Sequence, residues 1–160
     1  MSCKYSAVIY DDIANGEGVG AVLFMQGCSH HCKGCHNPQT WDFESGYELT
    51  EDVLNNIFDY INNPFVSRLT LSGGDPLDNY ESSYEIAKKF KQLFPNKELW
   101  LFTGYTMKEL YDLQKDDILQ YIDVLIDGPF IESERDITLE FRGSKNQNLY
   151  KKVQNKWEKQ

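Results

Sequence analysis

The run Cys28-Ser29-His30-His31-Cys32-Lys33-Gly34-Cys35 places three cysteines in one short loop with the spacing C-x3-C-x2-C. Soft sulfur ligands favour iron–sulfur clusters, zinc or copper(I), and three thiolates from one loop can surround one metal centre. Ordinary iron–sulfur clusters take four cysteine ligands, yet the only other cysteine, Cys3, lies far upstream. A cluster held by three cysteines leaves one iron open, and an open position is typical of a catalytic metal site.

Two other interpretations of the loop have to be weighed. A structural zinc site would use the three cysteines with one nearby histidine as the fourth ligand, which could be His30, His31 or His36. A disulfide framework is disfavoured, because four cysteines in 160 residues without a secretory signal do not resemble an oxidised extracellular scaffold. Cys3 is most simply a free thiol outside the site.

The composition predicts one packed domain over residues 1–160. The chain is 41% hydrophobic and 14% aromatic, which is enough for a core. The longest apolar run, residues 21–25, is far too short to cross a bilayer, and without a charged-then-apolar leader the expected location is the cytoplasm. The net charge of −9 argues against nonspecific nucleic-acid binding, although residues 145–159 are locally basic.

Short apolar runs alternate with amphipathic stretches along the chain. The apolar runs predict strands over residues 21–25, 68–72, 99–103 and 124–126, with weaker signals at 7–10 and 138–141. Helical spacing predicts helices after Thr50, over residues 84–94 and after Thr106, where Thr106 and Glu109 fit a capping box.

This alternation predicts βαβ units and a mostly parallel sheet with right-handed crossovers. A complete eight-unit barrel needs about 250 residues, so this chain can supply only about four to five βα units. The expected fold is therefore an α/β domain built as an open, partial βα barrel.

Every unusual motif falls at the carboxyl end of a predicted strand. The cysteine loop follows the first strand, and the next three strands are followed by Ser72-Gly73-Gly74-Asp75-Pro76, Thr103-Gly104-Tyr105 and Asp127-Gly128-Pro129-Phe130. Two of these motifs, Gly73-Gly74-Asp75-Pro76 and Asp127-Gly128-Pro129, are each also ordinary turn chemistry. In parallel α/β architectures, however, ligands gather at this edge. The convergence of four motifs on one edge therefore predicts a site.

The cysteine motif after an apolar strand resembles the cluster motif of the radical S-adenosylmethionine (radical SAM) enzymes. Residues 28–42, which end in Cys35-His36-Asn37-Pro38-Gln39-Thr40-Trp41-Asp42, are similar to the activating enzymes of glycyl-radical proteins. The short chain and the motifs at 100–105 and 142–147 resemble, within that group, the activators of anaerobic ribonucleoside-triphosphate reductases. The resemblance covers nearly the whole chain, with one departure: Gly34 stands where the wider superfamily usually has an aromatic residue.

The resemblance implies an oxidoreductase in which Cys28, Cys32 and Cys35 hold a 4Fe–4S cluster and S-adenosyl-L-methionine binds the open iron. One-electron reduction would cleave this cofactor to methionine and a 5′-deoxyadenosyl radical, which takes a hydrogen from a glycine of the partner reductase. An electron donor such as a flavodoxin or ferredoxin would supply the electron. The resemblance implies neither nucleic acid nor membrane as a partner.

The resemblance also implies a set of cofactor-binding residues. They are Gly34, Cys35, His36, Ser72, Gly73, Gly74, Asp75, Thr103 and Asp127. In this family the backbone of the glycine pair holds the methionyl ammonium. Two alternative functions remain: an activator of another glycyl-radical enzyme such as pyruvate formate-lyase, and a non-catalytic zinc-binding interaction module.

Overall fold

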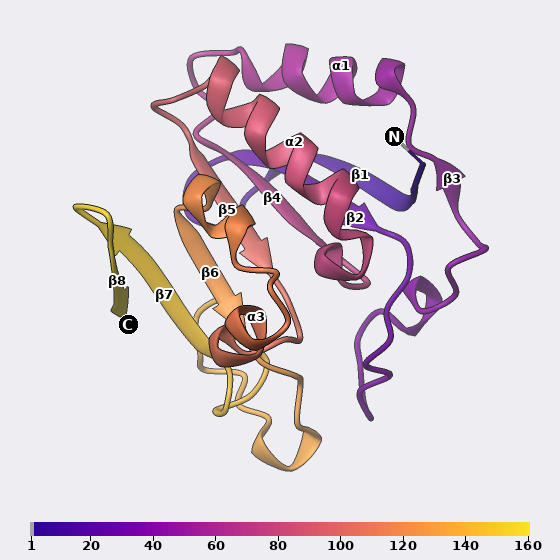
Figure 1. The fold of residues 1–160 in the computed structure, drawn as a ribbon, viewed down its shortest axis with the longest axis vertical. Helices are drawn as coiled ribbons and strands as arrows, with labels where there is room; N and C mark the ends of the chain where they lie inside the picture. The colour runs from indigo at the N-terminus through magenta and orange to yellow at the C-terminus, as the bar shows by residue number, and fades with distance from the viewer. Residues whose placement is uncertain (1) are drawn as a thin grey trace.

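The computed structural model describes residues 2–160. An eight-stranded sheet runs through these residues in the order β3-β1-β2-β4-β5-β6-β7-β8 (Figure 1). Its strands are β1 (Lys4–Asp12), β2 (Gly20–Met25), β3 (Tyr47–Glu48), β4 (Arg68–Gly73), β5 (Glu98–Phe102), β6 (Val124–Asp127), β7 (Asn148–Val153) and β8 (Lys156–Lys159). The helices are α1 (Glu51–Ile61), α2 (Tyr80–Leu93) and α3 (Met107–Asp112), with short 3-10 turns η1 (Pro38–Thr40), η2 (Pro76–Asn79), η3 (Asp117–Tyr121) and η4 (Glu132–Glu134).

The sheet is mixed, whereas the sequence predicted a mostly parallel one. Its four central strands, β2, β4, β5 and β6, are parallel. Antiparallel strands flank them, β1 and β3 on one side and β7 and β8 on the other. Short connections join β1 to β2 and β7 to β8, and antiparallel neighbours need no helical crossover. The sheet is open, because β3 and β8 stand at opposite ends of the strand order.

The predicted central strands and the three predicted helices are present. Thr50 caps α1 by accepting a hydrogen bond from the N–H of Val53 at 3.3 Å. Thr106 and Glu109 form the predicted capping box at the start of α3. The pattern of apolar residues and caps was therefore sufficient to place these elements.

Two predictions near the sheet edges fared differently. Residues 7–10 lie within β1, but the strand predicted at 138–141 is wrong. There the N–H and Oγ1 of Thr138 both bond the carboxylate of Asp136, and Phe141 has a φ of 59°. A side-chain turn and a left-handed residue cannot continue a strand, so local hydrogen bonding outweighed the apolar pattern.

Sequence reasoning also missed the hairpin of β7 and β8, which carries much of the basic segment 145–159. The two residues between these strands, Gln154 and Asn155, both have positive φ (50° and 61°). Such a pair matches the twist of a two-residue hairpin. Because the turn contains no glycine, its sequence signal is weak.

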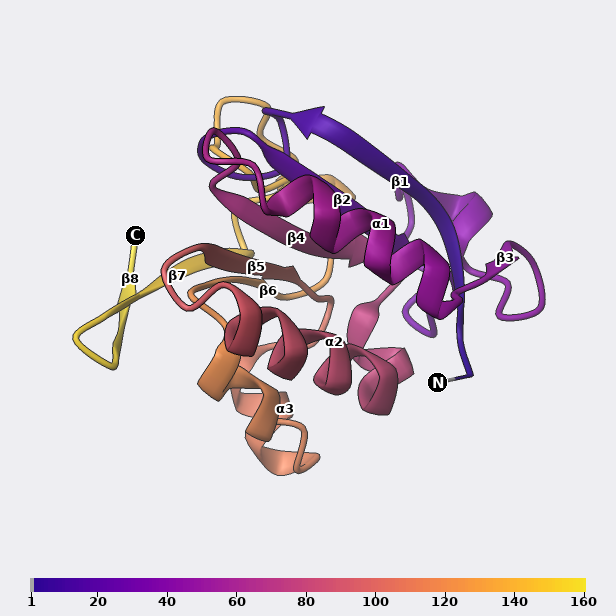
Figure 2. The same cartoon turned by 90° about the horizontal axis from the view of Figure 1, so that it is seen from above.

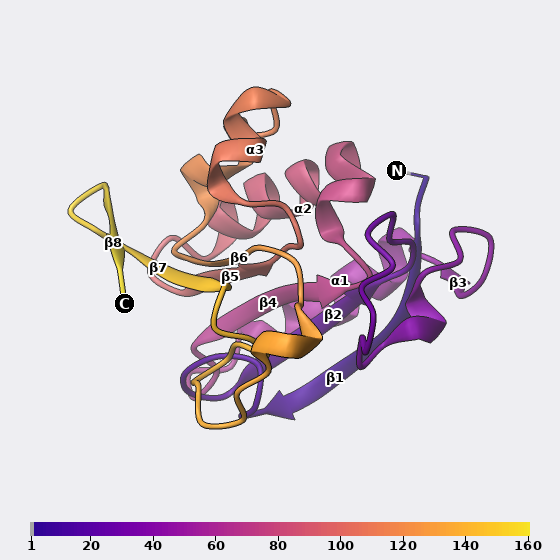
Figure 3. The ribbon, with the colours of Figure 1, turned by 90° about the horizontal axis from the view of Figure 1, so that it is seen from below.

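Helices α1, α2 and α3 cover one face of the sheet (Figures 2 and 3). The main core lies between them, where Leu23, Leu71 and Leu101 of the strands pack with Ile57 and Phe90 of the helices. No helix within residues 2–160 is long and apolar enough to span a membrane.

A smaller core lies on the other face, where Trp100, Val124, Ile126 and Leu149 are buried. Phe141 covers Trp100 edge-on, with the ring centroids 5.0 Å apart. The long connection between β6 and β7 therefore packs on the face opposite the helices (Figure 3).

Candidate metal and cofactor site at the carboxyl edge of the sheet

A cavity of about 140 Å³ lies where the four parallel strands end. The cysteines of the loop line it together with Ser72, Gly73, Gly74, Asp75 and Thr103, and its apolar wall consists of Phe102, Ile126 and Phe130. The motifs that follow β2, β4 and β5 in the sequence therefore meet, as predicted. A larger hollow of about 790 Å³ lies between α1 and α2, but the described residues that line it include no cysteine.

The cysteine loop (residues 28–35) folds back over the strand ends. At its base Gly27 has a φ of 108°, and its N–H donates to the carbonyl of Thr40 at 2.7 Å. The N–H of Cys35 donates to the carbonyl of Cys32, which closes a turn between these two cysteines. Cys28 is buried, the other two are half-buried, and all three thiols are free. The backbone therefore directs three free thiols to one cavity.

The glycine pair serves the packing of backbones rather than leaving open space for a ligand. A Cβ on Gly73, whose φ is 122°, would lie 2.3 Å from the carbonyl oxygen of Met25. A Cβ on Gly74 would lie 2.4 Å from the carbonyl oxygen of Gly27. Glycine is therefore required at both positions, because a side chain would collide with the backbone of Met25 or Gly27. The two residues still line the cavity through their backbones.

Asp75 is fully buried, and both its carboxylate oxygens have protein donors. The N–H groups of Leu77 and Gly104 donate at 3.0 and 2.9 Å, and Thr103 Oγ1 donates at 3.0 Å. His30 Nε2 lies 2.6 Å from Oδ2. The carboxylate therefore joins the cysteine loop to the ends of β4 and β5, a role that the sequence did not indicate.

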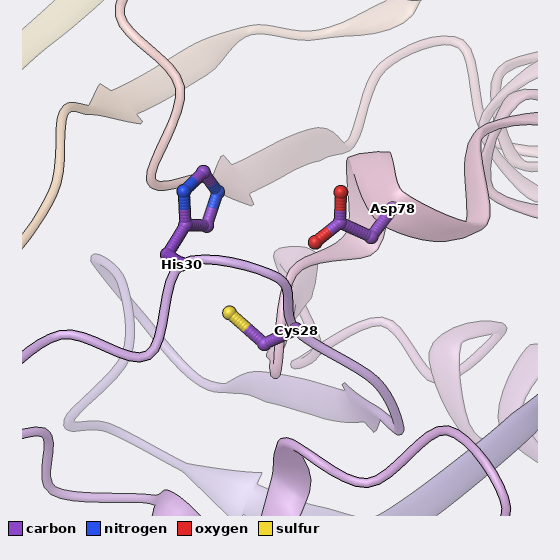
Figure 4. Close-up of side chains that lie close together, drawn as sticks. All are labelled: Cys28, His30 and Asp78. Atoms are coloured by element: carbon purple, nitrogen blue, oxygen red, sulfur yellow. The ribbon is translucent and has the colours of Figure 1, made fainter.

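Asp78 is a second link that the sequence did not reveal. Its Oδ2 accepts hydrogen bonds from the N–H and Oγ of Ser29, and its Oδ1 accepts one from the hydroxyl of Tyr105. Figure 4 shows Cys28, His30 and Asp78 around one space, and their potential ligand atoms lie within 4.8 Å of one another. Asp78 stands in η2, six residues beyond the end of the nearest predicted strand, so only folding brings it to the loop.

The electrostatic surroundings favour protonated forms of two loop residues. Burial, reinforced by the negative charges of Asp75 and Asp78, raises the pKa of the Cys28 thiol to about 11. The hydrogen bond to Asp75 raises the pKa of His30 above its ordinary value. The free Cys28 thiol is therefore protonated at neutral pH, and a metal that binds it has to displace a proton.

Three predicted cofactor residues do not line the cavity. Asp127 is buried, and its carboxylate accepts hydrogen bonds from the backbone N–H groups of Met107 and Asn148. It therefore fixes the loops around β6 instead of facing a ligand. Gly34 and His36 are exposed on the outer side of the cysteine loop, where the His36 ring packs 5.5 Å from that of Phe130.

The donor set of three free thiols fits an iron–sulfur cluster with one open iron. Nε2 of His30 is engaged by Asp75, and His31 stacks on Trp41 with the ring centroids 4.6 Å apart. Cys3 lies in the main core under the helices. Three thiols therefore converge without a fourth cysteine among the described residues that line the cavity.

Comparisons with known proteins agree with this donor set. Residues 14–150 match the family model described as a 4Fe-4S single cluster domain. The chain is 42% identical over 144 residues to the anaerobic ribonucleoside-triphosphate reductase-activating protein of Vibrio cholerae. This alignment covers 88% of this chain and 92% of the relative. It is 35% identical over 156 residues to the protein of that name from Enterobacteria phage T4, an alignment that covers 96% of this chain and 97% of the relative. It is 37% identical over 143 residues to the protein of that name from Escherichia coli K12, with 87% of this chain and 92% of the relative covered. The chain therefore belongs to the family of anaerobic ribonucleoside-triphosphate reductase-activating proteins, whose domain carries a single 4Fe-4S cluster.

Proposed function

We propose that the protein is a radical SAM activating enzyme, in which Cys28, Cys32 and Cys35 would bind a 4Fe–4S cluster. This cluster would supply the electron that cleaves S-adenosyl-L-methionine. The cleavage would lead to a glycyl radical on an anaerobic ribonucleoside-triphosphate reductase. The observation that carries the proposal is that these three thiols line the same cavity as the backbone of Gly73 and Gly74. The names of the relatives support the choice of the reductase as the protein substrate.

The residues around the cavity have distinct parts in this proposal. The three thiols, once deprotonated, bind iron, and the missing fourth cysteine leaves a position for the amine and carboxylate of the cofactor. Ser72, Gly73, Gly74 and Thr103 line the cavity. In this proposal the backbone of the first three offers polar groups to that cofactor, while the hydroxyl of Thr103 holds Asp75. Phe102, Ile126 and Phe130 form an apolar wall that limits access of water to a reactive radical.

The open sheet suits a macromolecular substrate. We interpret the four parallel strands and their helices as an incomplete βα barrel of the radical SAM type, in which the carboxyl edge stays accessible from one side. A glycine in a loop of another protein can reach such an edge, whereas a small metabolite would need an enclosed pocket. An external electron donor and a cytoplasmic location also belong to this proposal.

The test uses the protein reconstituted anaerobically with iron and sulfide, then reduced and mixed with S-adenosyl-L-methionine and the reductase. Electron paramagnetic resonance (EPR) should show a glycyl radical as a doublet split by the remaining α-hydrogen. Replacement of the target glycine of the reductase by alanine should remove the signal. If pyruvate formate-lyase is activated instead, the choice of substrate is wrong. A colourless protein that binds zinc but no iron would exclude the whole mechanism.

A further inference from the structure

We propose that His30 and Asp75 form a latch that fixes the cysteine loop against the ends of β4 and β5, with His30 as a positioning residue for the cysteines on either side of it. The inference deepens the proposed function and rests on it for the identity of the cluster. His30 lies midway between Cys28 and Cys32 in the sequence, and its side chain lines the cavity.

The first part of the latch is the contact between His30 Nε2 and Asp75 Oδ2 at 2.6 Å. Asp75 cannot move to follow the loop, because it is fully buried and also accepts hydrogen bonds from Leu77, Thr103 and Gly104. A hydrogen bond to a charged, buried acceptor is stronger than one between neutral groups. The loop is therefore tied at His30 to a rigid acceptor.

The second part is the close fit of the imidazole ring. The ring packs edge-on against Tyr105 with the centroids 4.6 Å apart. The ring also lies against Gly104, where an added Cβ would be only 2.6 Å from Cδ2 of His30. Gly104 does not have a positive φ, so its backbone does not require glycine. The absence of a side chain at Gly104 therefore makes room for the ring.

The adjacent hydrogen bonds reinforce this arrangement. Ser29 bonds Asp78 through its N–H and its hydroxyl, and Tyr105 bonds the other oxygen of the same carboxylate. The following residues of the loop, His31, Lys33 and Gly34, are exposed. The loop is thus held firmly at its first half, which carries Cys28 and leads into Cys32.

The test compares His30→Ala, His30→Gln, Gly104→Ala and the double variant His30→Ala/Gly104→Ala. The matched control is His31→Asn, which changes the neighbouring exposed histidine and keeps a residue that tolerates its φ of 49°. Iron release to a chelator from the reconstituted proteins is the first measurement. His30→Ala should release iron about tenfold faster than the parent, as expected for loss of a charge-assisted hydrogen bond. His30→Gln, which keeps an N–H donor, should restore most of the retention.

Gly104→Ala tests the latch without removing a hydrogen-bonding group, because alanine keeps the N–H that donates to Asp75. It should speed iron release in the parent but add nothing in the His30→Ala background, because the clash needs the ring. His30→Ala should also broaden the EPR spectrum of the reduced cluster and raise the KM for S-adenosyl-L-methionine more than it lowers kcat. Equal iron release by His30→Ala and His31→Asn, or an equal effect of Gly104→Ala in both backgrounds, would overturn the proposal.

Hydrogen exchange of the cluster-free proteins separates this proposal from the proposed function. Amides of residues 28–35 should exchange faster in His30→Ala than in the parent, whatever reaction the protein catalyses. If these differences appear while no glycyl radical forms on the reductase, the latch stands and the proposed function fails. If the radical forms while the exchange and iron release of all variants match the parent, the latch fails and the function stands.

Discussion

Arg68 and Asp12 form an ion pair inside the protein, with Nη2 of Arg68 2.7 Å from Oδ2 of Asp12 and the arginine side chain fully buried. Arg68 also donates to the carbonyl oxygens of Gly16 and Glu17 and to the hydroxyl of Thr70. The pair therefore fixes the connection between β1 and β2 across the start of β4.

Removal of the Asp12 carboxylate should destabilise the protein, because the Arg68 guanidinium stays buried. Asp12→Ala leaves a buried guanidinium without its carboxylate, and the expected loss is about 3–5 kcal/mol in the free energy of unfolding. Urea denaturation at neutral pH measures this loss. The exposed carboxylate of Asp59 on α1 provides the control, because Asp59→Ala should change stability by less than about 0.5 kcal/mol.

The same pair predicts a pH dependence. Burial alone would raise the pKa of Asp12, but hydrogen bonds from Asn15 and Arg68 outweigh it and lower the pKa below its ordinary value. The stabilisation is therefore present above the unfolded pKa of about 3.9 and is lost as the pH falls through the lower folded value. The stability difference between the parent and Asp12→Ala should be constant near neutrality and shrink below about pH 4. A difference that grows on acidification would contradict this assignment.

The cysteines should fall into two classes. Cys28→Ala, Cys32→Ala and Cys35→Ala should each abolish the iron–sulfur cluster and cleavage of S-adenosyl-L-methionine. Cys3→Ala should retain both, because Cys3 lies in the main core away from the cavity. Iron and sulfide analysis after anaerobic reconstitution makes the comparison. A fully loaded cluster in any of the three loop variants would rule out three-cysteine ligation.

Gly74→Ala should displace the start of the cysteine loop at Gly27. The new Cβ would lie 2.4 Å from the carbonyl oxygen of Gly27, and neither backbone can yield easily. Overpacking of this kind costs typically about 1–3 kcal/mol. The variant should lose thermal stability and retain less iron than the parent. Normal iron retention combined with weak binding of S-adenosyl-L-methionine would instead mean that Gly74 acts directly on the cofactor.

Tyr105→Phe should reveal the hydroxyl that supports Asp78. Burial, with the hydrogen bond to Asp78, raises the pKa of Tyr105 to about 12. The contribution of the Tyr105 hydroxyl to stability is therefore present below the unfolded pKa of about 10, and it is lost as the pH rises through the pKa in the folded protein. Removal of the hydroxyl should cost about 1 kcal/mol at neutral pH. Spectroscopic titration of both proteins should show that the variant lacks one phenol that ionises near pH 12.

The sequence by itself determined the central strands and helices of the fold, and it placed the three candidate metal ligands in one loop. Apolar runs and caps located β2, β4, β5 and β6 with the helices between them, because buried strands and capped helices leave local signals. The spacing of Cys28, Cys32 and Cys35 also predicted the metal ligands, since three thiols in one loop need no distant partner.

Only the tertiary structure decided how the rest of the site is held. Asp75 follows β4 and Asp127 ends β6, yet the Asp75 carboxylate ties the cysteine loop and the Asp127 carboxylate accepts hydrogen bonds from backbone N–H groups outside the cavity. Asp78 and Tyr105 reach the loop only through folding, and the antiparallel outer strands depend on pairing between distant segments. Such contacts join residues far apart in the chain, so no local pattern of residue types records them.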